Sequence, residues 1–407
     1  MSEVVIVGGG LAGLTCARRL QTRGHACRVL EATDAVGGRV RTDRVEGFLL
    51  DRGFQVLLTA YPAARRWLDY DALALRRFSP GARVWCDGAL HTVSDPNRDP
   101  AGLVATLQAP VGSLGDKMKI ATLRAEARRG ALEDVFTRPE TTALEALHAH
   151  GFSNVMTERF LRPWLGGIFL DDSLSASSRM LMFVMRMFAE GDAAVPAAGM
   201  QAIPEQLAAA LAPGTVRVNA PVAAVGNGAV TLQSGERIAA DAVVVATDGA
   251  AAAELLPTMA APSWRPVTCL YFAAPASPLA APVLALNGSG TGVVNNVAVM
   301  SDVAPGYAPA QQSLVSVSVL KQSDATDGAL AAQVQAELEG WFGPGVRAWR
   351  WLRTYRVDRA LPVRWPLEVG APLAVSPGVW VAGDFQTTAS IQGAMESGER
   401  VADAIAG

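Results

Sequence analysis

The chain has 407 residues, half of them apolar and only 18% charged, which indicates a globular protein of two or three structural units with a large core. Its 35 basic and 38 acidic residues give a formal charge of −3, so no basic surface that would hold a nucleic acid is expected. The four cysteines and four histidines stand at spacings that fit no metal site.

The first forty residues have the pattern of a strand, a glycine turn, a helix and a second strand. Residues 4–7 are a short β-branched run, and residues 11–23 have a helical pattern that ends at Gly24. Residues 27–30 form another apolar run. The sequence therefore opens with a predicted βαβ unit.

The rest of the chain changes from mostly helical to mostly strand-forming sequence. Between about residues 95 and 189, glycine and proline interrupt helical segments such as 114–129 and 141–150. Gly-Asn-Gly at 226–228 and Ser-Gly-Glu at 234–236 then predict hairpin turns, the second joining strand 229–232 to strand 242–246. The strands expected after residue 200 are 216–218, 222–225, 229–232, 242–246, 267–272, 293–300, 314–320 and 379–382, and the helices are 329–342 and 392–406.

The segment from Gly8 to Gly13 has the pattern G-x-G-x-x-G between the first predicted strand and helix, with Leu11 and Ala12 at the start of that helix. Gly8 permits a tight turn, Gly10 lets a pyrophosphate approach the backbone, and Gly13 lets the helix pack closely on the strand. The helix N-terminus offers N–H groups to the phosphates. A glycine turn with a purely structural role has the same pattern.

Glu31 ends the second predicted strand, 18 residues after Gly13. A carboxylate at this place accepts hydrogen bonds from a ribose and repels a 2′-phosphate. The position predicts an adenosine with a free ribose, and it is equally compatible with NAD and FAD.

A second glycine motif, E-x5-G-G-R, is formed by Glu31, Gly37, Gly38 and Arg39. The two glycines permit close passage of the backbone, and the guanidinium can neutralise a pyrophosphate from the side opposite the helix terminus. The motif resembles the second signature of the flavin amine oxidase superfamily. This resemblance implies FAD rather than NAD, with Ala32 beside Glu31 in the cofactor site.

The resemblance extends to residues 51–55, which are similar to the family segment that brings backbone past the isoalloxazine ring. It implies that Gly53, Phe54 and Gln55 contact the cofactor. Residues 220–222 resemble the strand whose valine backbone meets adenine, so Val222 is either an adenine contact or an ordinary residue of a buried strand.

Residues 379–384 and 391–398 resemble the family's terminal G-D motif and flavin-facing helix. The family implies that Asp384, which follows Gly383, accepts a ribityl hydroxyl. It also implies that the helix terminus formed by Gly393, Ala394 and Met395 faces the flavin N1/O2 edge, where a helix terminus stabilises the negative charge of a reduced flavin. Because no cysteine follows Cys269, we expect the FAD to be held without a covalent bond.

Two segments, 162–170 and 195–204, resemble carotenoid and squalene-type desaturases, although Ala198 replaces the first glycine of their P-x-G-G-M pattern. Amine oxidases of the family carry a lysine near flavin N5, where this chain has Thr268, and an aromatic residue before the last helix, where it has Ser390. The resemblance thus implies an oxidoreductase that takes a hydride from an apolar, polyisoprenoid-type substrate.

Other functions of the same superfamily stay open, and no side chain can be identified as a catalytic base. They are an amine or protoporphyrinogen oxidase, a redox-neutral double-bond isomerase, and a flavin-binding protein without turnover. The methionine-rich residues 180–188 are either a core helix or the lining of a substrate tunnel. The basic residues between Lys117 and Arg129 are either a solvated helix face or a contact to an anionic membrane.

We therefore predict an α/β fold in which a Rossmann-like FAD-binding domain (1–78, 200–255 and 375–407) is interleaved with a mixed-sheet and helical substrate domain (79–199 and 256–374). The N-terminus has no basic leader pattern, and no apolar run approaches the ~18 residues that span a bilayer. A cytoplasmic location with peripheral membrane contact is the expectation, and the sequence predicts no oligomeric state.

Overall fold

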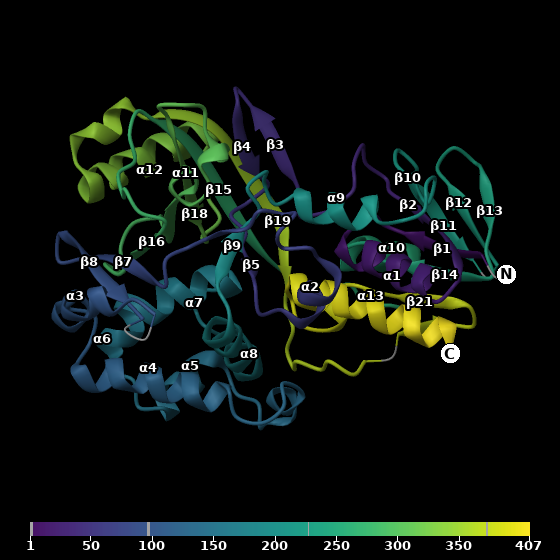
Figure 1. Ribbon diagram of the computed structural model, residues 1–407, viewed down its shortest axis with the longest axis horizontal. Coiled ribbons are helices and arrows are strands. Elements are labelled where there is room, and N and C mark those ends of the chain that lie inside the picture. Colours follow the sequence, from purple (N-terminus) through teal and green to yellow (C-terminus); the bar gives the residue numbers. More distant parts are fainter. Residues whose placement is uncertain (1–2, 96–97, 227, 372) are drawn as a thin grey trace.

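A six-stranded sheet lies at the end of the molecule where both chain termini are found (Figure 1). The computed structural model describes residues 3–95, 98–226, 228–371 and 373–407. The strand order is β10-β2-β1-β14-β21-β20, parallel from β10 to β21 with β20 antiparallel at the edge. The strands are β1 (Glu3–Val7), β2 (Ala26–Leu30), β10 (Val216–Arg217), β14 (Ala242–Val245), β20 (Ala374–Ser376) and β21 (Val379–Val381).

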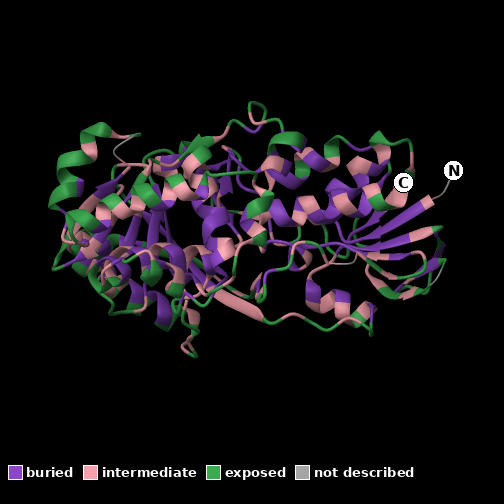
Figure 2. Ribbon diagram, turned by 90° about the horizontal axis from the view of Figure 1, so that it is seen from below, coloured by how far each residue is buried: buried purple, intermediate pink, exposed green. Residues whose placement is uncertain are grey.

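Two helices from opposite ends of the chain, α1 (Leu11–Thr22) and α13 (Ile391–Ala406), pack side by side next to this sheet (Figure 1). Their contact is close because Gly398 has no side chain, and a Cβ there would lie 2.1 Å from the carbonyl oxygen of Ala12. The central strands are buried along most of their length (Figure 2). The predicted βαβ unit is confirmed, and the carboxyl ends of the parallel strands meet at one edge, where open α/β sheets bind ligands.

The hairpins after the first sheet differ from the prediction in one place. Strands β11 (Val222–Gly226), β12 (Ala229–Leu232) and β13 (Arg237–Ala239) form an antiparallel sheet of their own. The Ser-Gly-Glu turn leads into β13, whereas the predicted strand 242–246 is β14, which pairs in parallel with β1. The prediction was wrong because a tight turn joins only adjacent strands, and β13 was too short to be recognised. Asn227 of the other predicted turn lies outside the described residues.

A seven-stranded mixed sheet occupies the other side of the molecule, in the order β19-β15-β18-β17-β16-β7-β8. Valines of β18 pack against α12 (Asp327–Phe342), which buries Leu330, Val334 and Leu338. The strands are β7 (Gly81–Cys86), β8 (Ala89–Ser94), β15 (Trp264–Ala274), β16 (Leu284–Asn287), β17 (Asn296–Val299), β18 (Ser313–Val319) and β19 (Arg350–Pro362).

The predicted helical block lies against this sheet at the lower left of Figure 1. Two of its helices begin with reciprocal capping boxes, Ser113 with Asp116 and Thr142 with Glu145, which explains where they start. The elements are η1 (Pro100–Gly102), α3 (Leu103–Gln108), α4 (Leu114–Ala127), η2 (Glu133–Thr137), α5 (Ala143–Ala149), α6 (Asn154–Met156), η3 (Thr157–Leu161), α7 (Arg162–Phe169) and α8 (Ser178–Glu190).

Short elements connect the two large sheets. A three-stranded sheet in the order β5-β9-β6 pairs strands from residues 57–77 with β9 (Ala193–Val195), and so joins segments predicted to lie in different domains. The predicted domain boundaries stay a prediction. The remaining elements are β3 (Thr42–Val45), β4 (Phe48–Asp51), β5 (Leu57–Leu58), α2 (Pro62–Trp67), β6 (Arg76–Arg77), α9 (Ala202–Ala209), α10 (Gly249–Leu255), α11 (Met300–Val303), η4 (Pro305–Tyr307), η5 (Pro344–Ala348) and η6 (Asp384–Gln386).

Candidate functional site

One cavity of about 1650 Å³ runs from the carboxyl edge of the six-stranded sheet into the helical block. Its wall includes the glycine turn after β1, the segment after β4, the inner side of β19 and the start of α13. Single ligand pockets in proteins hold ~300–1,000 Å³. The cavity is therefore large enough for two molecules.

The glycine turn leaves the N-terminus of α1 open to the cavity. Gly8 has a φ of +111°, and a Cβ there would lie 2.6 Å from the carbonyl oxygen of Ala246. A Cβ on Gly10 would meet no protein atom within 4 Å, because this residue faces the cavity. No side chain caps α1, so its first N–H groups are positioned to bind an anion.

Glu31 lies at the cavity wall directly after β2 and is 7% exposed. Its carboxylate accepts hydrogen bonds from the N–H of Gly9 at 2.7 Å and from both the N–H and the hydroxyl of Thr33. These three donors fix the carboxylate beside the glycine turn, at the place where a ribose would follow a pyrophosphate.

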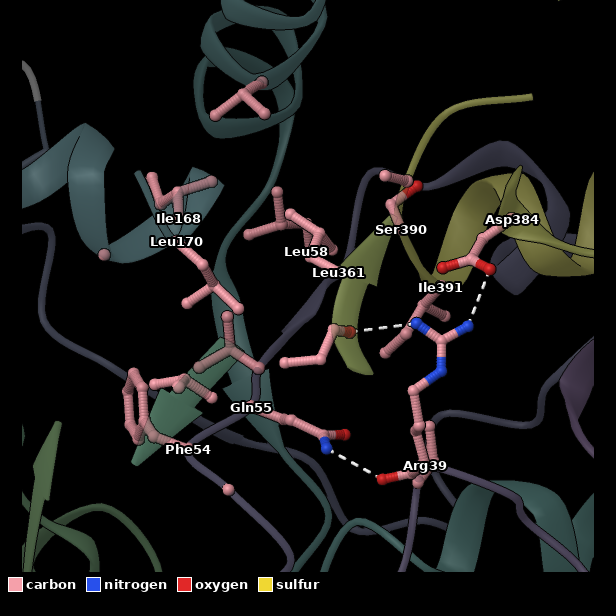
Figure 3. Close-up of a pocket in the computed structure, with 18 of the residues that line it drawn as sticks. Arg39, Phe54, Gln55, Leu58, Ile168, Leu170, Leu361, Asp384, Ser390 and Ile391 are labelled. Atoms are coloured by element: carbon pink, nitrogen blue, oxygen red, sulfur yellow. Dashed lines mark hydrogen bonds and ion pairs between the residues drawn. The ribbon is translucent and has the colours of Figure 1, made fainter. Parts of the chain in front are cut away.

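Arg39 and Asp384 meet in the middle of the cavity wall (Figure 3). The guanidinium lies 2.6 Å from the carboxylate of Asp384, donates to the carbonyl of Ala360 at 2.9 Å, and stacks on the ring of Trp264. Burial by itself lowers the pKa of Arg39, but the adjacent Asp384 outweighs it and the pKa is raised. Arg39 therefore stays a cation at the cavity wall, held by a residue from the far end of the chain.

The segment after β4 forms the part of the cavity wall next to this pair. Gly53 has a φ of +94°, which turns Phe54 and Gln55 toward the cavity. The side-chain amide of Gln55 donates to the carbonyl of Arg39 at 2.9 Å (Figure 3). The two sequence motifs that carry Arg39 and Gln55 are thus bonded directly to each other.

At the start of α13, Ser390 is the N-cap and accepts a hydrogen bond from the N–H of Gly393 at 3.0 Å. Ser390 and Ala394 line the cavity, but Gly393 and Met395 do not. Gly393 packs where a Cβ would lie 1.8 Å from the carbonyl oxygen of Thr388, and Met395 is fully buried in the core.

Most of the residues predicted to bind the cofactor come together at this one cavity. Gly13 does not line it, because it packs against the carbonyl of Gly8, and Gly393 and Met395 lie behind the wall as described above. Those that line it are Gly8, Gly10, Leu11, Ala12, Glu31, Ala32, Gly37, Gly38, Arg39, Gly53, Phe54, Gln55, Val222, Gly383, Asp384 and Ala394.

The far part of the cavity is apolar and was only partly foreseen. Leu58, Ile168, Leu170 and Leu361 face the space next to Phe54 (Figure 3). Ile168 and Leu170 belong to the segment 162–170 that resembles desaturases, whereas Leu58 and Leu361 were not identified from the sequence. Farther in, the wall is formed by rings and methionines of α7, α8 and their neighbours. These residues are Phe160, Trp164, Met180, Val184, Met185 and Phe188. Five residues of α8 line the cavity, and four of them belong to the methionine-rich segment 180–188, so the tunnel interpretation applies to these four.

Thr268, the position compared with the amine oxidase lysine, does not line the cavity. Its neighbour Val267 of β15 does, and both residues line a small second pocket. The comparison with the lysine position stays a prediction. Lys117 is the single lysine among the described residues of the cavity wall, and it lies on α4.

Two charged residues beside the predicted adenosine site, Asp248 and Arg359, were also missed. Both line the cavity, and they lie 3.4 Å apart. Asp248 follows the carboxyl end of β14, so the rule that ligands bind at such strand ends was the available signal.

No helix in the described part of the chain is long and apolar enough to cross a membrane.

A family model for flavin-containing amine oxidoreductases matches residues 11–406. L-amino-acid oxidase from Crotalus adamanteus is 32% identical over 134 residues, which are 33% of this chain and 26% of that protein. Coproporphyrinogen III oxidase from Propionibacterium freudenreichii subsp. freudenreichii is 37% identical over 79 residues, or 19% of this chain and 15% of that protein. The matched parts are therefore only 26% and 15% of the two relatives' lengths.

The solved structure of an oxidoreductase from Methanosarcina mazei has the same fold, with a TM-score of 0.77 at 17% identity over 98% of this chain and 100% of that one. The predicted α/β architecture is thus confirmed by a whole-chain structural match as well as by the sheets described above. The chain belongs to the flavin-containing amine oxidoreductase family.

Proposed function

We propose that the cavity holds one FAD without a covalent bond along its sheet edge, and an apolar substrate in the remaining space. The free N-terminus of α1 and the open face of Gly10 suit a pyrophosphate, and Glu31 suits a ribose. None of the described residues that line the cavity is a cysteine, which favours non-covalent binding. In this proposal Arg39 neutralises the pyrophosphate and Asp384 orients Arg39 while accepting a ribityl hydroxyl.

The reaction we propose is dehydrogenation of a long apolar molecule to form a new C=C bond, in which one carbon loses a hydride and the adjacent carbon loses a proton to water. A bound FAD would supply the hydride acceptor, which is the chemistry that the protein itself cannot provide. Leu58, Ile168, Leu170 and Leu361 exclude water and hold the substrate chain. The observation that carries this proposal is the large share of apolar side chains, among them Phe54 and Phe188, in the wall of the far part of the cavity.

The test is anaerobic mixing of the flavin-loaded protein with candidate substrates while the visible flavin absorbance is followed. A polyisoprenoid dispersed in detergent is expected to bleach the flavin, and primary amines are not. Bleaching by amines alone would overturn the proposal. The product mass separates desaturation from isomerisation, because a desaturated product loses two hydrogen atoms and an isomer loses none.

A porphyrinogen is the second candidate substrate, favoured by the similarity to a coproporphyrinogen III oxidase and by the three basic side chains that residues 98–124 contribute to the cavity wall. Lys117 donates to main-chain carbonyls, whereas Arg98 and Arg124 pair with carboxylates, so these groups are partly neutralised already. The same bleaching assay with a reduced porphyrinogen decides between the two classes of substrate.

A further inference from the structure

The short helix α3 is buried on its polar side and exposed on its apolar side. Thr106 is its one buried residue, and the hydroxyl of Thr106 donates to the carbonyl of Gly102 and accepts from the N–H of Ser94. Leu103, Val104 and Leu107 are 41%, 64% and 48% exposed. A surface helix normally has the opposite arrangement, so the outer face of α3 is suited to contact with an apolar phase.

The first turns of α4 repeat this inversion. Asp116 is 1% exposed, because its carboxylate accepts hydrogen bonds from Ser113 and Ser153, which lowers its pKa despite the opposing effect of burial. Leu114 and Met118, in contrast, are 60% and 66% exposed. Of the nine large apolar side chains that are exposed in the described part of the chain, six lie on α3, α4 and the adjoining α6.

No charged side chain occurs in the centre of this region, and basic side chains outnumber acidic ones on the helix that follows it. Residues 100–115 include no charged side chain. Over residues 114–129 there are five basic and two acidic side chains, and one of the acids is the buried Asp116. Lys117 and Lys119 flank the exposed Met118 in sequence. An apolar centre with a basic border matches the surface of a bilayer that contains anionic lipids.

The same apolar side chains form part of the cavity. Leu103, Leu107, Leu114 and Met118 are exposed to solvent and also line the cavity that begins at the glycine turn. We call α3 and the first two turns of α4 the apolar mouth. It lies at the end of the molecule away from both termini (Figure 1).

We propose that the apolar mouth docks on a bilayer with anionic headgroups and that the substrate enters the cavity directly from the acyl-chain region. This inference rests on the proposed function, because a route from a membrane is useful only for a lipid-soluble substrate. With a water-filled entrance, such a substrate would have to leave the membrane and cross water first. The leucines and the methionine of the apolar mouth would instead keep it in apolar surroundings between the acyl chains and the cavity. The basic border then orients the mouth toward the headgroups.

The experiment measures co-sedimentation with vesicles of phosphatidylcholine alone or mixed with phosphatidylglycerol. The flavin-loaded wild type is expected to bind the anionic vesicles and to bind them more weakly at high salt. Val104→Asp places a charge in the apolar mouth but outside the cavity wall, and it is expected to reduce partitioning about tenfold. Val218→Asp is the matched control, since Val218 is exposed on another part of the molecule, and it is expected to bind like the wild type.

Three results would overturn the inference. They are a wild type that fails to bind anionic vesicles at low salt, a Val104→Asp variant that binds equally well, and a wild-type dimer that Val104→Asp dissociates. The last would mean that a second copy covers the apolar mouth.

Flavin reduction by detergent-dispersed polyisoprenoid is measured on the same samples. Reduction without vesicle binding contradicts the docking alone, and vesicle binding without reduction contradicts the proposed function alone.

Discussion

Gly10 and Gly13 lie on the same turn at the start of α1, but the absence of a side chain has a different consequence at each. A Cβ on Gly13 would lie 2.1 Å from the carbonyl oxygen of Gly8, so this glycine permits the packing of helix on strand. A Cβ on Gly10 would contact no protein atom and would extend into the cavity. The backbone of Gly10 has a φ of −77°, which any residue can adopt.

Substituting each glycine with alanine separates folding from cofactor binding. Gly13→Ala is expected to lower the free energy of unfolding by about 3 kcal/mol through overpacking. Gly10→Ala is expected to change it by less than about 0.5 kcal/mol and yet weaken FAD binding at least tenfold, because the methyl group occupies space for the pyrophosphate. Urea unfolding and FAD titration measure the two effects. Tight FAD binding by Gly10→Ala would place the pyrophosphate elsewhere.

At the scale of elements, Asp51 connects the cavity to four parts of the fold. The residue ends β4, is 1% exposed, and accepts hydrogen bonds from the hydroxyl of Thr42, the N–H of Met200 and the hydroxyl of Tyr307. Its backbone carbonyl accepts another from Tyr271 at 2.8 Å. The cavity-lining residues Arg52 to Gln55 follow directly, so this cluster positions them.

The Asp51 carboxyl should make stability depend on pH. Burial raises its pKa to about 6, although the three hydrogen bonds oppose the shift. Since the unfolded pKa is ~3.9, the stability that the protonated carboxyl contributes is complete below about pH 4 and is lost as the pH rises through about 6. The loss amounts to about 3 kcal/mol.

Asp51→Asn removes this titration and leaves the other carboxyl groups in place. As the pH rises from about 4 to 7, the free energy of unfolding of the wild type should therefore fall by about 3 kcal/mol relative to that of the variant. Urea unfolding at a series of pH values measures it. A difference that stays constant over this range would show that the Asp51 carboxyl titrates normally.

The elements show which features can be predicted from sequence. The βαβ unit and E-x5-G-G-R are local patterns, and their residues line the cavity as a group. Strand β19 was missed because Arg350, Arg353, Arg356 and Arg359 make the segment resemble a solvated loop. Its alternating Tyr355, Val357 and Leu361 were the available signal, and all three line the cavity.

Long-range pairing could not be predicted from local patterns. Val4 of β1 pairs with Ala242 of β14, more than two hundred residues away, and no turn signal specifies such a pair. The apolar wall was hidden for the same reason, because Leu58, Ile168 and Leu361 come from three segments that only the fold brings together. Each of them alone is compatible with an ordinary core position.

At the scale of the whole molecule, one cavity connects two ends with different chemistry. The sheet end presents a helix N-terminus, a fixed carboxylate and an Arg–Asp pair, and the helical end presents leucines, methionines and aromatic rings. A dinucleotide suits the first end and an apolar chain suits the second. In the proposed function the dinucleotide comes first, because the proposed substrate would have no hydride acceptor without it.

The most direct measurement is therefore titration of the flavin-free protein with FAD, followed by acid precipitation. The expected result is saturation at one FAD per chain, with all of the yellow colour released into the acid supernatant. Protein that takes up no flavin, or a precipitate that stays yellow because the flavin is covalently attached, would contradict the account of the site.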